Sequence, residues 1–234
     1  MKSAEIPEIL FYAKGRAIAP GQISKALVDF RDSYKVATRK ITLKSKELDK
    51  DGEVFVACAS LILKAFGMTR SGPFKVDRTR KLHLCWDAIG ARLLQINHSV
   101  RETDFSRDRY LLEVGDPERE ELIAEIWLIT KRLLPLTMGK KSYGLVPASK
   151  ILFSVLPEIV LPIDNAQWLG VFKTVDFGDV IRRMVCDIQK WEAMTGRQLN
   201  DLDCTGRLTT LPSVYNVMAM LARPKPDDTK ENEM

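Results

Sequence analysis

The sequence predicts an all-α fold, because apolar residues recur at helical spacing in several segments while no segment shows a convincing period-two strand pattern. Glycine and proline separate these segments and supply turns between helices. A chain of 234 residues is long enough for one large domain or two small ones. We predict a single helical domain over residues 1–222, with a basic loop near residues 68–78 as the place where two lobes would divide. Residues 223–234 contain proline and many charges but no large apolar residue other than the terminal Met, which predicts a disordered tail.

Three helices are expected in the N-terminal half. Apolar residues recur at i, i+4, i+7 and i+11 over residues 23–34, which predicts one helix with a single buried stripe. Residues 53–66 are almost wholly apolar, and this length without polar alternation favours a central buried helix that ends at Gly67. A further apolar stripe over residues 82–93 predicts a helix that ends near His98.

The C-terminal half carries clearer helix boundaries. Asp116-Pro117-Glu118 combines an acidic N-cap, a proline at the first helical position and acids in the first turn, and Pro135 is expected to end that helix. Asp176 begins the most amphipathic segment, which Gly196 ends, and residues 212–222 form a short final helix. The cations of the 176–196 helix are expected on its outer face (Arg182, Arg183 and Lys190).

Basic charge is clustered in two places. The net charge is +5, but residues 14–50 alone hold ten basic residues against four acidic ones. A second cluster combines Asp77 with five cations (Arg70, Lys75, Arg78, Arg80 and Lys81). Clustered basic charge is typical of proteins that bind phosphate backbones, although solvated helix faces on a basic protein give the same pattern. We therefore expect a nucleic-acid partner.

Several classes of protein and site are disfavoured. No apolar run approaches the ~18 residues of a transmembrane helix, and residues 1–21 lack the features of a secretory signal, so a cytoplasmic protein is expected. The four cysteines form no Cys-x-x-Cys pair and the two histidines are scattered, so we expect no metal site and no cofactor. Walker, Gly-x-Gly-x-x-Gly and Ser/His/Asp patterns are absent from the sequence.

The most informative segment places a lysine fourteen residues before an aspartate. Pro147 fits the first turn of a short helix that carries Lys150, and Leu161-Pro162-Ile163 then leads to Asp164 at the start of the next helix. The helix dipole and apolar neighbours both disfavour an ammonium group, so Lys150 is a candidate amine nucleophile or phosphate clamp. Asp164 is a candidate base or electrostatic stabiliser. The alternative is that Asp164 and Gln167 only cap a helix and Lys150 points to solvent.

These residues resemble the helix-hairpin-helix superfamily of DNA glycosylases. In that family a Gly-rich hairpin binds the phosphate backbone, the next helix carries a catalytic lysine in some members, and an essential aspartate follows in a Val-Pro-Val-Asp-like segment. The resemblance covers about residues 139–170, with Leu161-Pro162-Ile163-Asp164 and Trp168 matching the aspartate segment. The chain differs in that its hairpin has one glycine, Gly144, and in that it has no four-cysteine iron–sulfur motif.

The resemblance implies a DNA-binding enzyme that flips and excises a damaged or modified base, including modified bases of phage DNA, and leaves an abasic site. Separately, we expect a monomer. Asp164 and Lys150 would be the catalytic residues. The expected DNA contacts combine the hairpin with the second basic cluster (Lys140, Lys141, Gly144, Arg78, Arg80 and Lys81). The aromatic candidates for stacking on a base are Trp168, Tyr143, Trp127 and Phe153, although aromatic residues in helices are more often part of a core.

Two other functions fit the same sequence. A non-catalytic helical nucleic-acid-binding module would explain the basic clusters without the lysine and the aspartate. A helical protein-interaction or toxin–antitoxin component would instead bind an acidic partner through the basic segment. Salt-sensitive DNA binding would separate the first two readings from the third, because phosphate contacts dominate both.

Overall fold

A computed structural model describes residues 11–13, 16–70, 72–103, 106–139, 144–208 and 210–223. It confirms the all-α prediction, and two strands of two residues each, β1 and β2, add a small antiparallel ribbon. No helix of the described residues is long and apolar enough to cross a bilayer. The elements are β1 (Tyr12–Ala13), β2 (Arg16–Ala17), α1 (Pro20–Asp29), α2 (Asp32–Lys44), η1 (Ser45–Glu47), α3 (Glu53–Ala65), α4 (Arg78–Arg101), η2 (Arg107–Arg109), α5 (Tyr110–Glu113), α6 (Asp116–Thr137), α7 (Leu145–Val155), η3 (Gln167–Phe172), α8 (Phe177–Thr195), η4 (Asn200–Leu202) and α9 (Leu211–Leu221).

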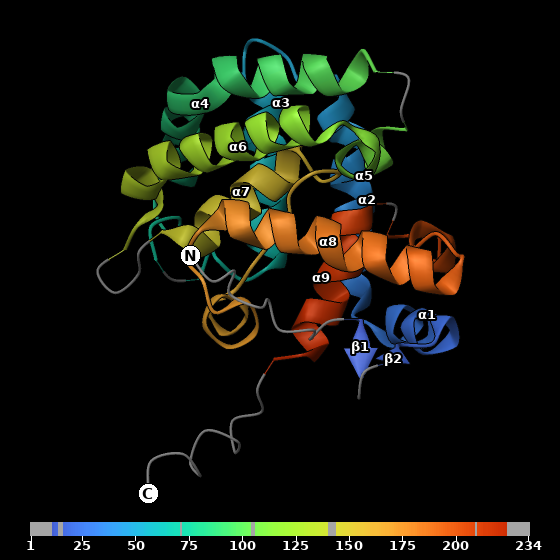
Figure 1. The fold of residues 1–234 in the computed structure, drawn as a ribbon. Coiled ribbons are helices and arrows are strands. Elements are labelled where there is room, and N and C mark those ends of the chain that lie inside the picture. The colour runs from blue at the N-terminus through green and yellow to red at the C-terminus, as the bar shows by residue number, and fades with distance from the viewer. Residues whose placement is uncertain are drawn as a thin grey trace, which may run out of the picture.

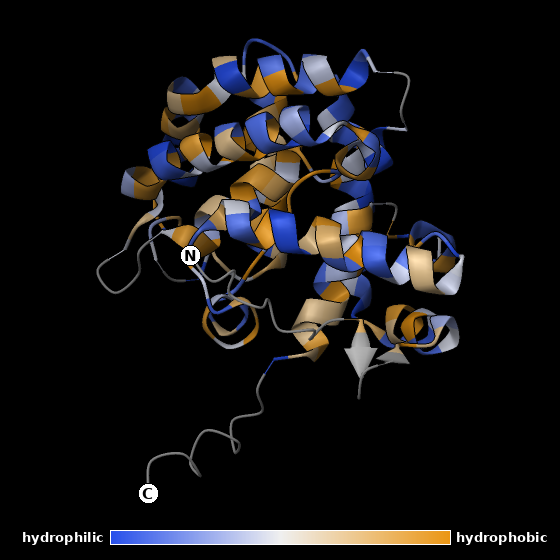
Figure 2. Ribbon diagram, viewed as in Figure 1, coloured by the Kyte–Doolittle hydropathy of each residue, from blue (hydrophilic) through white to orange (hydrophobic). Residues whose placement is uncertain are grey.

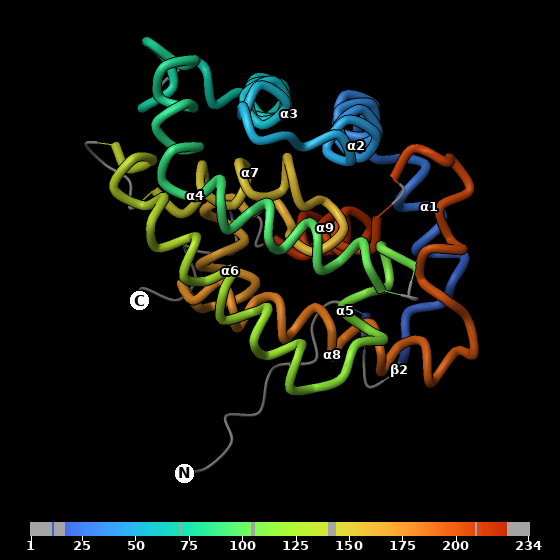
Figure 3. The backbone as a smooth tube through the Cα atoms, turned by 90° about the horizontal axis from the view of Figure 1, so that it is seen from above, coloured from blue at the N-terminus to red at the C-terminus, as the bar shows by residue number. Residues whose placement is uncertain are grey.

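Helix α7 lies at the centre of the molecule and packs against α2, α3 and α6 (Figure 1). Seen from above, α4 and α6 run together on one side of α7, and α2 and α3 stand on another (Figure 3). Every residue from Pro147 to Val155 is buried, and α7 is accordingly coloured as largely hydrophobic (Figure 2). A helix that is buried on all sides is held in place by the core around it, so α7 gives Lys150 a fixed position.

Helix α3 and two cysteines lie in the core. Residues 53–65 form the predicted central helix, α3, and Gly67 follows with φ of 71°. Cys58 and Cys85 are both buried, and burial raises the pKa of the Cys58 thiol to about 11 and that of Cys85 to about 12. Thiols with such pKa values stay protonated at neutral pH and act as small apolar side chains.

Helix α8 begins and ends where the sequence predicts. The Asp176 carboxylate accepts hydrogen bonds from the backbone N–H groups of Gly178 (2.7 Å) and Asp179 (3.3 Å), which is a complete N-cap. Gly196 ends the helix in the left-handed region, with φ of 65°. Of the three cations expected on the outer face, however, Arg183 is buried, and its Nη1 donates to the carbonyl of Val171 (3.2 Å).

Two predicted helix boundaries are wrong. The stripe over residues 23–34 does not belong to one helix, because Phe30 and Arg31 adopt extended backbone angles and separate α1 from α2. Lys35 then turns inward and donates to the carbonyl of Val28 (2.6 Å), which ties the two helices together. Pro135 does not end α6, which continues to Thr137; the Thr137 hydroxyl donates to the carbonyl of Leu133 (2.9 Å) within this last turn.

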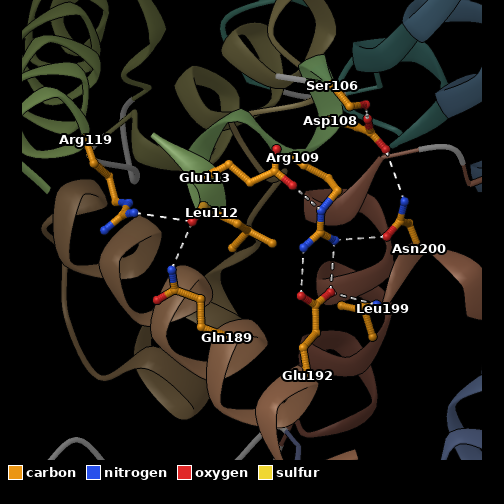
Figure 4. A network of polar contacts seen from close by, with 10 residues as sticks. All are labelled: Ser106, Asp108, Arg109, Leu112, Glu113, Arg119, Gln189, Glu192, Leu199 and Asn200. Atoms are coloured by element: carbon orange, nitrogen blue, oxygen red, sulfur yellow. Dashed lines mark hydrogen bonds and ion pairs between the residues drawn. The ribbon is translucent and has the colours of Figure 1, made fainter. Parts of the chain in front are cut away.

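A network around Arg109 fixes α8 to the segment before α5 (Figure 4). The guanidinium group of Arg109 binds both carboxylate oxygens of Glu192 (3.1 and 2.8 Å), and its Nε donates to Glu113 (2.8 Å). Asn200 accepts a further hydrogen bond from Arg109 (3.2 Å). Bidentate pairs of this kind restrict orientation as well as adding energy, so the network holds η2, α8 and η4 in one arrangement.

Gly144 precedes α7 in the left-handed region, with φ of 81°, and a Cβ there would lie 2.7 Å from Thr137 Oγ1 and 2.8 Å from the carbonyl oxygen of Leu134. We expect Gly144→Ala to lower the free energy of unfolding by about 2 kcal/mol, because it combines backbone strain with a clash. Urea denaturation would measure this effect. Gly196→Ala is the matched control, since Gly196 also has positive φ but nothing within 4 Å. Equal losses in both variants would contradict the role of close packing at Gly144.

Candidate active site

A serine brings Lys150 and Asp164 to one place. Ser149 in α7 is fully buried, and its hydroxyl accepts a hydrogen bond from the backbone N–H of Ile163 (3.1 Å) while donating to the carbonyl of Val146 (3.0 Å). These contacts hold the segment before Asp164 against the start of α7. Residues next to the two ends of this link, Lys150 and Asp164, therefore line the same cleft.

The cleft encloses about 450 Å³ and is built from five parts of the chain. The junction of α1 and α2 forms one wall, the end of α3 with the following turn forms a second, and α7, the Asp164 loop and the end of α9 complete it. Its charged side chains are five cations and one anion (Arg31, Lys64, Arg70, Lys150, Arg223 and Asp164). This composition favours an anionic ligand.

Lys150 lies deep in the cleft, with 6% of its surface exposed. Its Nζ is 5.2 Å from the centroid of the Phe66 ring. Burial lowers the pKa of the Lys150 ammonium to about 8, and the charge of Asp164 acts in the opposite direction. A lysine with this pKa has a sizeable neutral fraction near physiological pH, which is the form that attacks a carbon centre.

Asp164 is held by two kinds of contact. Its Oδ1 accepts from the backbone N–H of Gln167 (2.9 Å), and Gln167 Oε1 accepts from the backbone N–H of Asp164 (2.9 Å), which is a reciprocal capping box. Its Oδ2 forms a 2.7 Å ion pair with Nη1 of Arg223. The capping interpretation of Asp164 is thus confirmed, while the alternative of a solvent-facing Lys150 is wrong.

Buried amides connect Asp164 to another wall of the cleft. Gln167 Nε2 donates to the side-chain oxygen of Asn216 (2.8 Å), and Asn216 Nδ2 donates to the hydroxyl of Tyr34 (3.0 Å). Tyr34 lines the cleft, and its ring makes edge contacts with Phe30 and Phe66 at centroid distances of 5.2 and 5.4 Å. The orientation of Asp164 is therefore linked to α9 and to the aromatic wall of the cleft.

The structure describes only some of the residues that the sequence predicts to contact DNA. Lys140, Lys141 and Tyr143 lie outside the described residues, so their roles in the hairpin stay predictions. Gly144 is described, and its carbonyl accepts from the Thr137 hydroxyl (2.9 Å). The second group lies at the start of α4 and does not line the cleft: Arg78 donates to Ser60 (3.0 Å), Lys81 donates to the carbonyl of Pro73, and Arg80 is exposed.

The remaining aromatic candidates do not line the cleft. Phe153 is fully buried and Trp168 is 2% exposed, with the Trp168 ring packed against Phe177 at a centroid distance of 5.6 Å. Trp127 is partly buried on α6, and Lys131 lies over its ring at 5.7 Å. These three side chains belong to the core and its edge, and the rings that line the cleft are instead Phe30, Tyr34 and Phe66.

Sequence reasoning missed several residues of the cleft. The sequence places Arg223 in the tail, yet its guanidinium group pairs with Asp164 and its Nε donates to the carbonyl of Met220 (2.9 Å). The sequence places Lys64 and Phe66 only in a buried helix. Arg31 and Arg70 belong to two separate basic clusters, and their charge is the signal in the sequence that marks them. No protein-family model, curated protein or solved structure matches the chain.

Proposed function

We propose that the protein is a DNA glycosylase-like enzyme that excises a damaged or modified base from DNA. The observation that carries this proposal is the meeting of Lys150 and Asp164 in one cationic cleft. A buried amine with a lowered pKa beside a fixed carboxylate suits chemistry at a sugar carbon. The cleft holds four further cations, of which Arg223 is paired with Asp164, and this excess of positive charge suits a phosphate-bearing substrate.

The reaction follows from the charges. As the base departs with the electron pair of the N-glycosidic bond, positive charge develops on the sugar, and the Asp164 carboxylate stabilises it. Water then forms the new bond to the sugar carbon, its hydroxyl stays there, and its remaining proton ends on the departed base. If the neutral amine of Lys150 attacks the same carbon instead, it forms an imine with the opened sugar, which water hydrolyses to the same abasic product.

The first experiment uses duplexes that contain damaged and modified bases, including those of phage DNA, and measures alkali-labile abasic sites. We expect product from at least one duplex and a loss of 100-fold or more in Asp164→Asn, a size typical of removing a group that stabilises transition-state charge. Asp29→Asn, an exposed aspartate at the end of α1 outside the cleft, is the matched control. Borohydride trapping of an enzyme–DNA adduct, tested beside Lys150→Ala, would show whether the amine takes part.

A second candidate is a non-catalytic nucleic-acid-binding module. The contacts of Asp164 favour it, because one carboxylate oxygen accepts from the backbone N–H of Gln167 and the other is neutralised by Arg223. This candidate predicts no abasic product from any duplex and salt-sensitive DNA binding that survives both Asp164→Asn and Lys150→Ala. That combination of results would replace the enzymatic proposal.

A further inference from the structure

Three cations on the rim of the cleft have no partner among the residues that the structure describes. Arg31 lies at the junction of α1 and α2, Lys64 near the end of α3, and Arg70 in the turn that follows. All three are exposed, and none makes a side-chain hydrogen bond or an ion pair with a described residue. Their charges are therefore available to a ligand.

Many of the other described arginines form ion pairs with carboxylates. Arg109 binds Glu192, Arg182 binds Glu120 (2.8 Å) and Arg223 binds Asp164. The carboxylate next to Arg31 in the sequence, Asp32, is likewise taken, by Lys35 (3.5 Å) and Arg207 (3.2 Å). The free cations at the rim thus stand apart from the ion pairs that stabilise the fold.

An aromatic wall joins the two segments that carry these cations. Phe30 precedes Arg31 and contacts Tyr34, and Tyr34 contacts Phe66, which lies between Lys64 and Arg70 in the chain. Phe66 also faces the Lys150 amine. Positive charge at the rim, ring surfaces along the wall and a nucleophile at the base match the three parts of a nucleotide: phosphate, base and sugar.

We infer that Arg31, Lys64 and Arg70 form a phosphate-ester binding site, which holds the phosphates beside the nucleotide that enters the cleft. Among the described residues, this site includes neither Gly144 nor the cations at the start of α4. This site gives the cleft a substrate class, a phosphate ester, and its role as part of a DNA-acting enzyme rests on the proposed function. Its test is independent of that function, because binding is measured without turnover.

The test compares two triple variants with the same change in charge. One carries Arg31→Gln, Lys64→Gln and Arg70→Gln; the control carries Arg39→Gln, Lys40→Gln and Arg197→Gln, which are exposed cations outside the cleft. Fluorescence anisotropy would follow binding of a duplex with a stable abasic-site analogue over a range of salt concentrations. Calorimetric titration of the same proteins with free deoxyadenosine monophosphate would distinguish a polymeric phosphodiester from a free nucleotide.

We expect the rim variant to lose about 10-fold or more in affinity near 0.1 M salt and the slope of log affinity against log salt to fall by about 2–3, since each phosphate contact contributes about 0.9. The control should stay within about 3-fold of the original chain. Equal losses in both variants, no loss in the rim variant, or no binding of either ligand would overturn the inference. Binding of the free nucleotide alone would support the phosphate site while contradicting an action on DNA, and intact binding without excision would contradict only the glycosylase proposal.

Discussion

Replacing Lys150 by methionine is expected to raise the free energy of unfolding by about 1–3 kcal/mol at pH 7, because a buried ammonium is costly and methionine keeps a similar apolar volume. Most single substitutions destabilise a protein, so a gain at this position would mark a side chain kept for chemistry rather than for folding. The same variant is expected to abolish any borohydride-trapped adduct, since it removes the amine.

The gain should depend on pH in a defined direction. The pKa of Lys150 is about 8 in the folded protein and 10.5 as an ordinary lysine, so between these values the unfolded chain binds more protons than the folded one. Wild-type stability therefore gains a contribution as the pH rises from about 8 to 10.5, which the methionine variant lacks. The advantage of Lys150→Met should be full below pH 8 and should shrink toward pH 10.

Urea denaturation at pH 7, 8.5 and 10 would measure this difference, and Lys64→Met is the matched control. Lys64 lines the same cleft but is exposed, so its replacement should change the free energy of unfolding by less than about 0.5 kcal/mol at every pH. A Lys150→Met variant that is less stable than the original chain, or a gain that is the same at all three pH values, would show that burial does not penalise the ammonium.

The parts of the fold that the sequence predicted well depend on local signals. Helix α8 is capped by Asp176 at its start and by Gly196 at its end, as expected, because an N-cap side chain and a left-handed glycine each act only on the helix end where they lie. Lys150 and Asp164 also meet largely through local structure, since a short buried segment and the Ser149 hydroxyl connect them. The sequence could suggest this pair because only fourteen residues separate its members.

Local signals in the sequence do not predict contacts between distant segments. Arg223 reaches Asp164 across 59 positions of sequence, and Asn216 meets Tyr34 across 182. Arg183 is buried on α8, where its Nη1 donates to the carbonyl of Val171, and the sequence pattern of α8 alone does not indicate this contact. The break between α1 and α2, which exposes Arg31 to the cleft, has no glycine or proline to mark it.

Asn216 offers the sharpest test of whether these distant contacts position the site. Asn216→Leu would leave Gln167 Nε2 without its acceptor and remove one hydrogen bond of the Tyr34 hydroxyl, and all three residues are buried. Leaving a buried amide group unpaired is expected to cost about 1–3 kcal/mol of stability. Because Gln167 also forms the capping box with Asp164, the same change should slow the proposed excision while leaving the proposed DNA affinity of the exposed rim nearly unchanged.

Asn97→Leu is the matched control for this change. Asn97 is also a buried helical asparagine, in α4, but its side-chain oxygen has no hydrogen-bond partner among the described residues. Asn97→Leu should therefore lower the free energy of unfolding clearly less than Asn216→Leu, because no donor loses a hydrogen bond to the Asn97 side-chain oxygen. Urea denaturation of the two variants, followed by excision assays on folded protein, separates the effects. Asn216→Leu could instead unfold no more easily than Asn97→Leu and keep the original rate of excision. The hydrogen bonds of Asn216 would then not position the site, and the capping box and Arg223 would be enough to hold Asp164.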